Sequence, residues 1–304
     1  MSFPSVADTR SMLETAGYIC TREIATVVFL AARTQKPILV EGPAGVGKTE
    51  LAKAVSRSLH REMIRLQCYE GLDEAKALYE WEYAKQLLYT QMVKDKIGDV
   101  VSGAASLSDA VNRIAGQEDA FFSERFMLPR PLLKSIRSDE PVVLLVDEVD
   151  KSDPEFEAFL LEVLSDHQVT IPELGTLKAV HIPFVVLTSN SYRDMSDALK
   201  RRCLHLYIDY PDASMELAIV RSKIPAIADS LARQMVEAMA RIRRLDLKKI
   251  PSISETLDWA HALVALQVET LSPRVVADTL NVICKHREDA RQVRDQASQV
   301  ANFG

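Results

Sequence analysis

The chain has 304 residues, with 37 Lys and Arg against 43 Asp and Glu, and so carries a net charge of −6. This length fits one large domain or two, and the surplus of acid argues weakly against a general nucleic-acid binder. Four dispersed cysteines, no long apolar run and no signal-peptide core disfavour a zinc ribbon, a disulfide framework and a membrane span, and they predict a cytoplasmic protein.

The first half of the chain predicts helices and strands that alternate around one glycine-rich loop. Helices are expected where apolar residues recur at helical spacing, and strands where short apolar runs are bounded by turn residues. In chain order the expected elements are a helix over 8–34, a strand over 37–41, a loop over 42–49, a helix over 50–59, a strand over 63–68, a helix over 72–93, a polar loop over 112–125 and a short helix over 131–138.

The second half predicts more strands and then only helices. The expected elements are a strand over 142–148, a helix over 156–166, a β-hairpin over about 167–181, and strands over 184–190 and 203–210. After Pro211 only helical patterns remain. Apolar strands separated by helices predict an α/β fold with a parallel sheet covered on both faces. We therefore expect an α/β core over 1–210, with an insert over about 70–140, and a small all-α domain over 211–304.

The glycine-rich loop fits the pattern GxxxxGK[ST] and lies between an expected strand and an expected helix. Glycines let backbone N–H groups turn inward around phosphate oxygens, and the N-terminus of the next helix favours an anion. Lys48 is expected to reach the β- and γ-phosphates as a catalytic residue, and the Thr49 hydroxyl to hold Mg²⁺. ATP with Mg²⁺ is the expected ligand, although the sequence leaves GTP open. The expected nucleotide-binding residues are Gly42, Pro43, Ala44, Gly45, Val46, Gly47, Lys48 and Thr49.

Polar residues also follow two later strands. The apolar run over 142–148 delivers Asp147 and Glu148 to its C-terminal end, where open parallel sheets bind their ligands. We expect Asp147 to bind Mg²⁺ and Glu148 to polarise the attacking water as a catalytic residue. Asn190 ends the strand over 184–190 and could orient water beside the γ-phosphate, although an Asn also suits a turn for geometric reasons alone.

Arginines later in the chain are candidates for stabilising phosphate charge. Arg201 and Arg202 precede the last expected strand, and either could act as a catalytic arginine finger on the γ-phosphate of a neighbouring subunit. A helix C-terminus that favours cations would also explain them. Arg274 lies in the first turn of a helix that Pro273 begins, where the helix dipole disfavours a cation, so it is expected to face an anion or else solvent.

These elements, in this order, resemble an AAA+ P-loop ATPase over about 18–290, and the finer resemblance is to the MoxR branch. EGPAGVGKTELAKA is similar to the P-loop of that branch, and the acid-ended strand followed by FEAFLLEVLSD is similar to its Walker B and central helix. DALKRRC resembles its finger segment, with Arg202 at the usual position, although Cys203 replaces the usual Phe. LSPR, which contains Arg274, resembles its sensor 2. The insert and the hairpin before Asn190 are also similar to features of that branch.

The resemblance implies a hexameric ring with ATP at the subunit interfaces, and a lid domain after the core. It also implies a partner with a von Willebrand factor A (VWA) domain and a role in maturing metalloenzymes. RLQCYEGLDEAKALYEW and RRCLHLYIDYPD are most similar to the subgroup encoded beside molybdenum hydroxylases such as carbon monoxide dehydrogenase. Aromatic residues of the insert could grip a client protein or could pack the insert on the sheet. They are Tyr69, Tyr79, Trp81 and Tyr83.

Three other functions share parts of this pattern. A nucleic-acid motor or restriction-type NTPase uses the same core, but the acidic balance and the lack of a recognisable nucleic-acid module disfavour it. A non-catalytic nucleotide switch needs neither Glu148, nor Asn190, nor a finger arginine. A small-molecule kinase is open to any P-loop protein, whereas arginines near a subunit edge favour catalysis shared between subunits. The sequence thus favours an ATP-driven chaperone that remodels a protein client.

Overall fold

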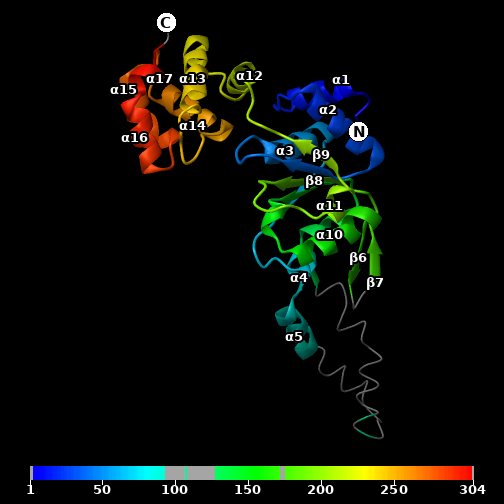
Figure 1. The fold of residues 1–304 in the computed structure, drawn as a ribbon. Coiled ribbons are helices and arrows are strands. Elements are labelled where there is room, and N and C mark those ends of the chain that lie inside the picture. The colour runs from blue at the N-terminus through cyan, green and yellow to red at the C-terminus, as the bar shows by residue number, and fades with distance from the viewer. Residues whose placement is uncertain (1–2, 93–105, 107, 109–126, 172–174, 303–304) are drawn as a thin grey trace.

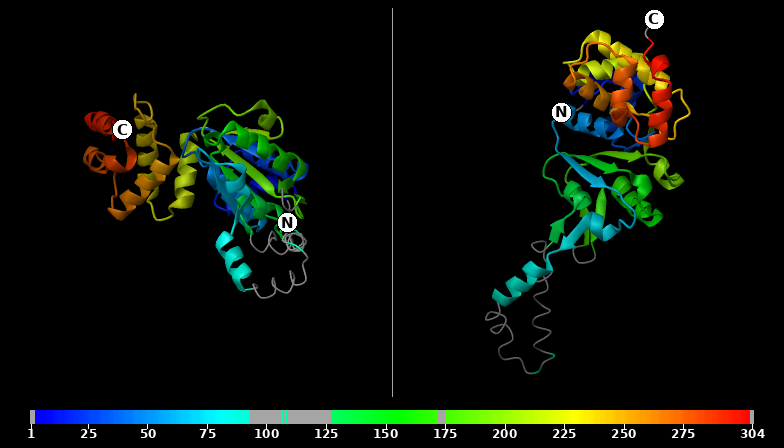
Figure 2. Two further views of the ribbon diagram at one scale, coloured as in Figure 1. Left: turned by 90° about the horizontal axis from the view of Figure 1, so that it is seen from below. Right: turned by 90° about the vertical axis from the view of Figure 1, so that its left-hand side faces the viewer.

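The computed structural model describes residues 3–92, 106, 108, 127–171 and 175–302, and it shows a sheet-based core beside a helical bundle (Figures 1 and 2). The elements of the core are α1 (Val6–Thr15), α2 (Arg22–Thr34), β1 (Ile38–Glu41), α3 (Lys48–Leu59), β2 (Met63–Gln67), α4 (Glu74–Leu78), β3 (Tyr79–Trp81), α5 (Tyr83–Met92), β4 (Met127–Pro129), α9 (Pro131–Ile136), β5 (Val143–Asp147), the 3₁₀ turn η2 (Val149–Lys151), α10 (Pro154–Asp166), β6 (Gln168–Ile171), β7 (Gly175–Lys178), β8 (Phe184–Ser189), α11 (Asp197–Lys200) and β9 (Leu204–Tyr207). The bundle consists of α12 (Ala213–Lys223), α13 (Asp229–Ile242), α14 (Ile253–Ala265), α15 (Pro273–Ile283), α16 (Arg287–Asp295) and α17 (Ala297–Val300).

The central sheet has five parallel strands in the order β2-β5-β8-β1-β9. Val143 pairs with Met63 on one side and with Phe184 on the other, and Ile38 lies between Val186 and Leu204. Since all five strands run the same way, their carboxyl ends meet at one edge of the sheet. The chain leaves β1 at that edge and enters the glycine-rich loop. The α/β fold class predicted from the sequence is confirmed.

Alternating apolar residues of the strands fill two cores, one on each face of the sheet. Leu144 and Val146 of β5 pack on the face that α9 and α10 cover, while Val143 and Leu145 pack on the face that α1, α2 and α3 cover. These four side chains are fully buried, as strands between two helical layers should be. The bundle has a third core of its own, with Trp259 fully buried at its centre and its indole N–H donating to Thr279 at 2.8 Å.

Two of the predicted helices are wrong. The segment 8–34 forms α1 and α2 rather than one helix, because Gly17 adopts a left-handed φ of +80° and Thr21 caps the second helix by accepting a hydrogen bond from the N–H of Ile24. The segment 72–93 is interrupted by β3, which pairs antiparallel with β4. Tertiary pairing thus overrides a helix-rich local sequence.

The insert joins the core at β3 and β4, and α5 lies at the end of the core opposite the helical bundle (Figure 1). The polar loop predicted over 112–125 lies outside the described residues. β6 and β7 pair antiparallel within the segment predicted as a hairpin. Across the part of the chain that the structure describes, no helix is both long enough and apolar enough to cross a membrane.

Candidate functional site

The backbone of the glycine-rich loop that follows β1 adopts a conformation that favours glycine at three positions. Gly42 has a φ of +147°, and a Cβ placed there would lie 2.0 Å from the carbonyl oxygen of Ile208. Gly45 and Gly47 also have positive φ, and Gly47 is the N-cap of α3. The loop therefore wraps closely around the first turn of α3, so that Lys48 and Thr49 begin that helix at the carboxyl edge of the sheet.

The Lys48 side chain is held inside the loop that precedes it. Its ammonium donates to the carbonyl oxygens of Gly42 at 2.6 Å and Pro43 at 2.7 Å, and to Oδ1 of Asn190 at 2.7 Å. Only 6% of this residue is exposed. Burial lowers the pKa of Lys48, while the nearby carboxylates of Asp150, Asp147 and Glu148 oppose that shift. The three N–H donors of the buried ammonium are thus all engaged by oxygen acceptors, which is how a lysine that binds phosphate oxygens is satisfied when they are absent.

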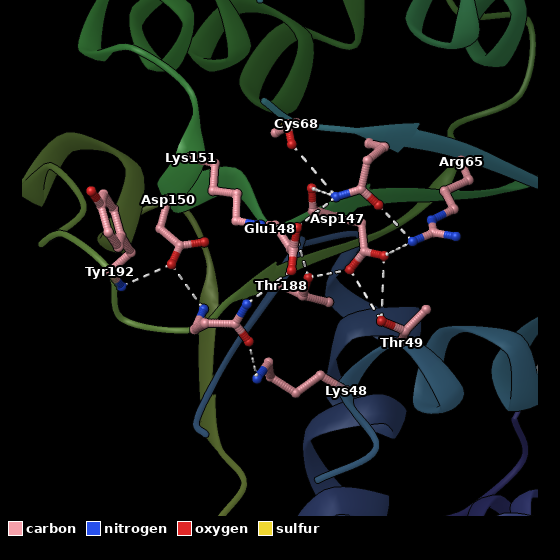
Figure 3. A network of polar contacts seen from close by, with 12 residues as sticks. Lys48, Thr49, Arg65, Cys68, Asp147, Glu148, Asp150, Lys151, Thr188 and Tyr192 are labelled. Atoms are coloured by element: carbon pink, nitrogen blue, oxygen red, sulfur yellow. Dashed lines mark hydrogen bonds and ion pairs between the residues drawn. The ribbon is translucent and has the colours of Figure 1, made fainter. Parts of the chain in front are cut away.

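Thr49 and Asp147 meet across the gap between α3 and β5. The Thr49 hydroxyl donates to Oδ1 of Asp147 at 3.1 Å, and Thr188 of β8 donates to the same oxygen (Figure 3). Arg65, from the neighbouring strand β2, forms an ion pair with Oδ2 of Asp147 at 2.5 Å. A carboxylate and a hydroxyl are the hard oxygen ligands that Mg²⁺ prefers. Arg65 and Thr188 are contacts that the sequence analysis missed.

Glu148 has three partners and a left-handed backbone, with a φ of +56°. Its Oε1 accepts from the side-chain amide of Asn190 at 3.1 Å. Its Oε2 accepts from Gln67 at 2.9 Å and from Lys151 at 2.7 Å, and this hydrogen bond raises the pKa of Lys151. In Figure 3, Lys151 points toward Glu148 beside Asp147. Gln67 and Lys151, like Arg65, were not predicted.

Asn190 is fixed at the end of β8 by the buried carboxylate of Asp150. One oxygen of Asp150 accepts from the backbone N–H groups of Asn190 at 3.0 Å and Tyr192 at 2.9 Å. The side chain of Asn190 then lies between Lys48 and Glu148 and hydrogen-bonds to both. The structure therefore brings together Lys48, Thr49, Asp147, Glu148 and Asn190 from the ends of β5 and β8 and the start of α3.

Two cavities adjoin the glycine-rich loop. One of 330 Å³ contains the polar residues just described and reaches Ser254 of α14. The other, of 570 Å³, lies between Tyr18, the loop at Gly45–Gly47, the segment 207–212, one side of α12 and the start of α14. Tyr18 is buried at its wall, and burial raises the pKa of its hydroxyl. The loop thus separates a polar cavity from a larger one shared by core and bundle.

The predicted arginines lie apart from these cavities. Arg202 is half-buried and donates to the hydroxyl of Ser165, near the C-terminal end of α10, at 2.5 Å and to the carbonyl oxygen of Ala198 in α11 at 3.0 Å. Arg201 is exposed. The side chain of Arg274 is 91% exposed and forms an ion pair with Asp278 at 3.7 Å. None of the three lines either cavity next to the loop.

The aromatic residues of the insert divide into two pairs. The rings of Tyr79 and Trp81 lie edge to face, with their centroids 5.8 Å apart, and both pack against the core. This arrangement supports the alternative in which these aromatics pack the insert on the sheet. Tyr69 is 48% exposed and Tyr83 is 68% exposed, so these two rings face outward.

Comparison with known proteins identifies the family. A family model described as an AAA domain of the dynein-related subfamily matches residues 37–203, which is more than half of the chain. An uncharacterized protein of Staphylococcus haemolyticus (strain JCSC1435) is 23% identical over 256 residues, which cover 81% of this chain and 84% of that protein. An uncharacterized protein of Staphylococcus aureus (strain bovine RF122 / ET3-1) is 25% identical over the same shares.

Among solved structures, a RuvB Holliday junction branch migration motor from Thermotoga maritima matches with a TM-score of 0.48 and 16% identity, covering 88% of this chain and 68% of that one. The chain belongs to the AAA domain family, dynein-related subfamily, and its core is an AAA+ P-loop NTPase fold.

Proposed function

We propose that this protein is an AAA+ ATPase of the MoxR type that hydrolyses ATP to ADP and phosphate with Mg²⁺ and uses the reaction to remodel a protein client. The observation that carries the ATPase activity is the single polar network from Lys48 through Asn190 to Glu148, with Asp147 and Thr49 beside it. The family supports nucleotide hydrolysis in general terms.

The phosphates of ATP fit the polar cavity. Backbone N–H groups of the loop and the N-terminus of α3 offer donors and positive potential to phosphate oxygens. Lys48 now donates to two loop carbonyls and to Asn190, and it would exchange these acceptors for the β- and γ-phosphate oxygens. The cavity of 570 Å³ on the other side of the loop is large enough for a nucleoside, with Tyr18 at its wall.

Mg²⁺ fits between Thr49 and Asp147, whose oxygens already lie 3.1 Å apart. Mg²⁺ is commonly bound by one or two protein oxygens together with substrate phosphates, and this pair offers that arrangement. When bound, the cation would neutralise phosphate charge as it develops. Arg65 forms an ion pair with the other oxygen of Asp147, so its positive charge competes with a cation for that carboxylate.

Glu148 is the proposed base that polarises the attacking water. It lies beside Asn190, at the carboxyl edge of the sheet and within the polar cavity. Its two oxygens are occupied by Asn190, Gln67 and Lys151, so at least one of these contacts must open before a water molecule can take its place. Asn190 then orients that water beside the γ-phosphate.

A shared active site is proposed for the arginines. Arg202 at the end of α11, with Arg201 as the alternative, would reach the γ-phosphate of a neighbouring subunit in a hexameric ring. Arg274 would contact nucleotide in the same assembly. Their positions outside the cavities of their own chain support contributions made from one subunit to another.

The client and the partner rest on the resemblance of the sequence to the MoxR branch. We propose a metalloenzyme client of the molybdenum hydroxylase type, such as carbon monoxide dehydrogenase, acting together with a VWA-domain protein. The exposed Tyr69 and Tyr83 are the insert residues that could contact it.

The test is the ATPase rate of Glu148→Gln compared with the wild type and with Glu155→Gln, an exposed glutamate in the first turn of α10. The Glu148 variant should bind ATP and lose at least about a hundredfold in turnover, as expected for loss of a general base. Glu155→Gln should match the wild type. Unchanged turnover in Glu148→Gln would remove Glu148 from the mechanism, and stimulation of the wild type by DNA would favour a nucleic-acid motor.

A further inference from the structure

The start of α14 rests directly on the P-loop. A Cβ at Gly45 would lie 2.1 Å from the hydroxyl oxygen of Ser252 and 3.3 Å from that of Ser254. Ser254 also lines the polar cavity together with Lys48 and Thr49, and among its described lining residues it alone comes from the helical bundle. One hydroxyl of the bundle therefore stands next to the proposed phosphate position.

The two serines have different surroundings. Ser252 is the N-cap of α14, and its hydroxyl accepts from the N–H of Ser254 at 3.2 Å and is also bonded to Glu255 in a capping box. The Ser254 side chain is exposed to the cavity, and within the described part of the chain no hydrogen bond engages its hydroxyl. Ser252 thus stabilises the helix start, whereas Ser254 is free to donate to a ligand.

A buried ion pair fixes this helix start to the rest of the bundle. Arg243 of the α13 C-terminus donates both terminal nitrogens to Glu216 of α12, at 2.6 and 2.7 Å. Arg243 also donates to the carbonyl oxygen of Pro251 at 2.8 Å, and the Thr256 hydroxyl donates to Glu216 at 2.6 Å. Glu216 is 1% exposed. Removal of one partner of such a pair is strongly destabilising, so these contacts hold α12, the end of α13 and the start of α14 together.

We propose that Ser254 is the residue of the helical bundle through which a subunit contacts the phosphates of its own bound nucleotide, with Arg243 and Glu216 as its positioning residues. This inference rests on the proposed ATPase function. The proposal assigns different roles to Ser254 and Arg274. Ser254 contacts the nucleotide of its own subunit, whereas Arg274, which is exposed on α15 outside the cavity, contacts nucleotide only between subunits of an assembly. The hydrogen bond from the neutral Ser254 hydroxyl to a phosphate oxygen is weaker than one from an arginine guanidinium would be.

The experiment measures the Kd of a fluorescent ATP analogue for charge variants at this position. Ser254→Asp places a negative charge against the phosphates and should weaken binding at least tenfold at low salt, and Ser254→Lys should tighten it. Ser230→Asp and Ser230→Lys make the same changes at an exposed position near the start of α13, outside both cavities, and should leave the Kd unchanged. Because opposite charges are expected to act in opposite directions, misfolding cannot reproduce the pattern.

Salt provides a second readout. The difference between the two Ser254 variants should shrink as ionic strength rises, since exposed charges are screened. Equal Kd values for Ser254→Asp, Ser254→Lys and the wild type would overturn the inference while leaving ATP binding intact. A tenfold loss in Arg274→Ala at concentrations where the protein is monomeric would also overturn it. Failure of the wild type to bind the analogue would overturn the proposed function itself, and the inference with it.

Discussion

The closest contact of the P-loop predicts a difference between two glycine substitutions. Gly42 and Gly71 both have positive φ, of +147° and +77°, but they differ in what a side chain would meet. A Cβ at Gly42 would lie 2.0 Å from the carbonyl oxygen of Ile208, well short of the 3.4 Å at which ordinary contact begins. A Cβ at Gly71 would meet nothing within 4 Å. Comparison of the two alanine variants therefore separates backbone strain from steric overlap.

The expected free energies follow from these two terms. The left-handed φ of Gly71 costs alanine about 1–2 kcal/mol, and this is the whole expected loss for Gly71→Ala. The φ of Gly42 lies outside the left-handed helical region and costs alanine about 1–3 kcal/mol, to which overlap with backbone adds about 1–3 kcal/mol. The total loss in Gly42→Ala should therefore be about 2–6 kcal/mol. Because Lys48 donates to the carbonyl oxygen of Gly42, displacement of the loop should also weaken ATP binding, which Gly71→Ala should leave unchanged.

The assay is thermal unfolding followed by far-UV circular dichroism, together with the Kd for ATP. Each kcal/mol corresponds to roughly 2–4 °C in Tm for a unit of 150–250 residues, so Gly42→Ala should melt several degrees below Gly71→Ala. Two variants with equal Tm and equal Kd would refute the reasoning, because they would show that the P-loop can move away from Ile208 at no cost.

Two further variants test the shared site and the metal position. Arg202→Ala should lower the ATPase rate per subunit by about a thousandfold in assembled protein, as loss of an arginine finger does. Arg201→Ala is the matched control. A large loss in the Arg201 variant alone would show that Arg201, not Arg202, is the arginine finger. Arg65→Ala removes the cation that now pairs with Asp147, so half-maximal ATPase activity should need severalfold less Mg²⁺. A higher Mg²⁺ requirement would mean that Arg65 orients Asp147 rather than competing with the metal ion.

The meeting of Lys48, Asp147 and Asn190 follows from general rules. Each residue follows an apolar strand, and parallel strands end at the same edge, so the pattern of strands and polar ends suffices to predict it. The partners of these residues could not be predicted in the same way. Arg65 and Gln67 are alternate residues of one strand, and only the strand order, with β2 beside β5, brings them to Asp147 and Glu148.

Contacts between the bundle and the P-loop could not be predicted from the sequence, for a different reason. Ser254 lies in a capping sequence whose local pattern explains a helix start and nothing more. Its place beside Gly45 depends on how the bundle packs against the core, which no local pattern encodes. Gly17 and Thr21 could have predicted that 8–34 forms two helices, because they mark the end of one helix and the start of the next. By contrast, β3 forms only by pairing with a strand more than 40 residues away.

Asn190 links phosphate binding to the state of Glu148. The side-chain oxygen of Asn190 accepts a hydrogen bond from Lys48, and its side-chain NH₂ group donates one to Glu148. A single planar amide therefore connects the ammonium and the carboxylate. If Lys48 turns to a phosphate, Asn190 loses a charged donor, and its amide no longer has the same geometry for Glu148. Binding free energies are reciprocal, so loosening of Glu148 should in turn favour phosphate at Lys48. Asn190→Asp would replace the amide by a second carboxylate beside Glu148, and should therefore disrupt this coupling while retaining the contact to Lys48.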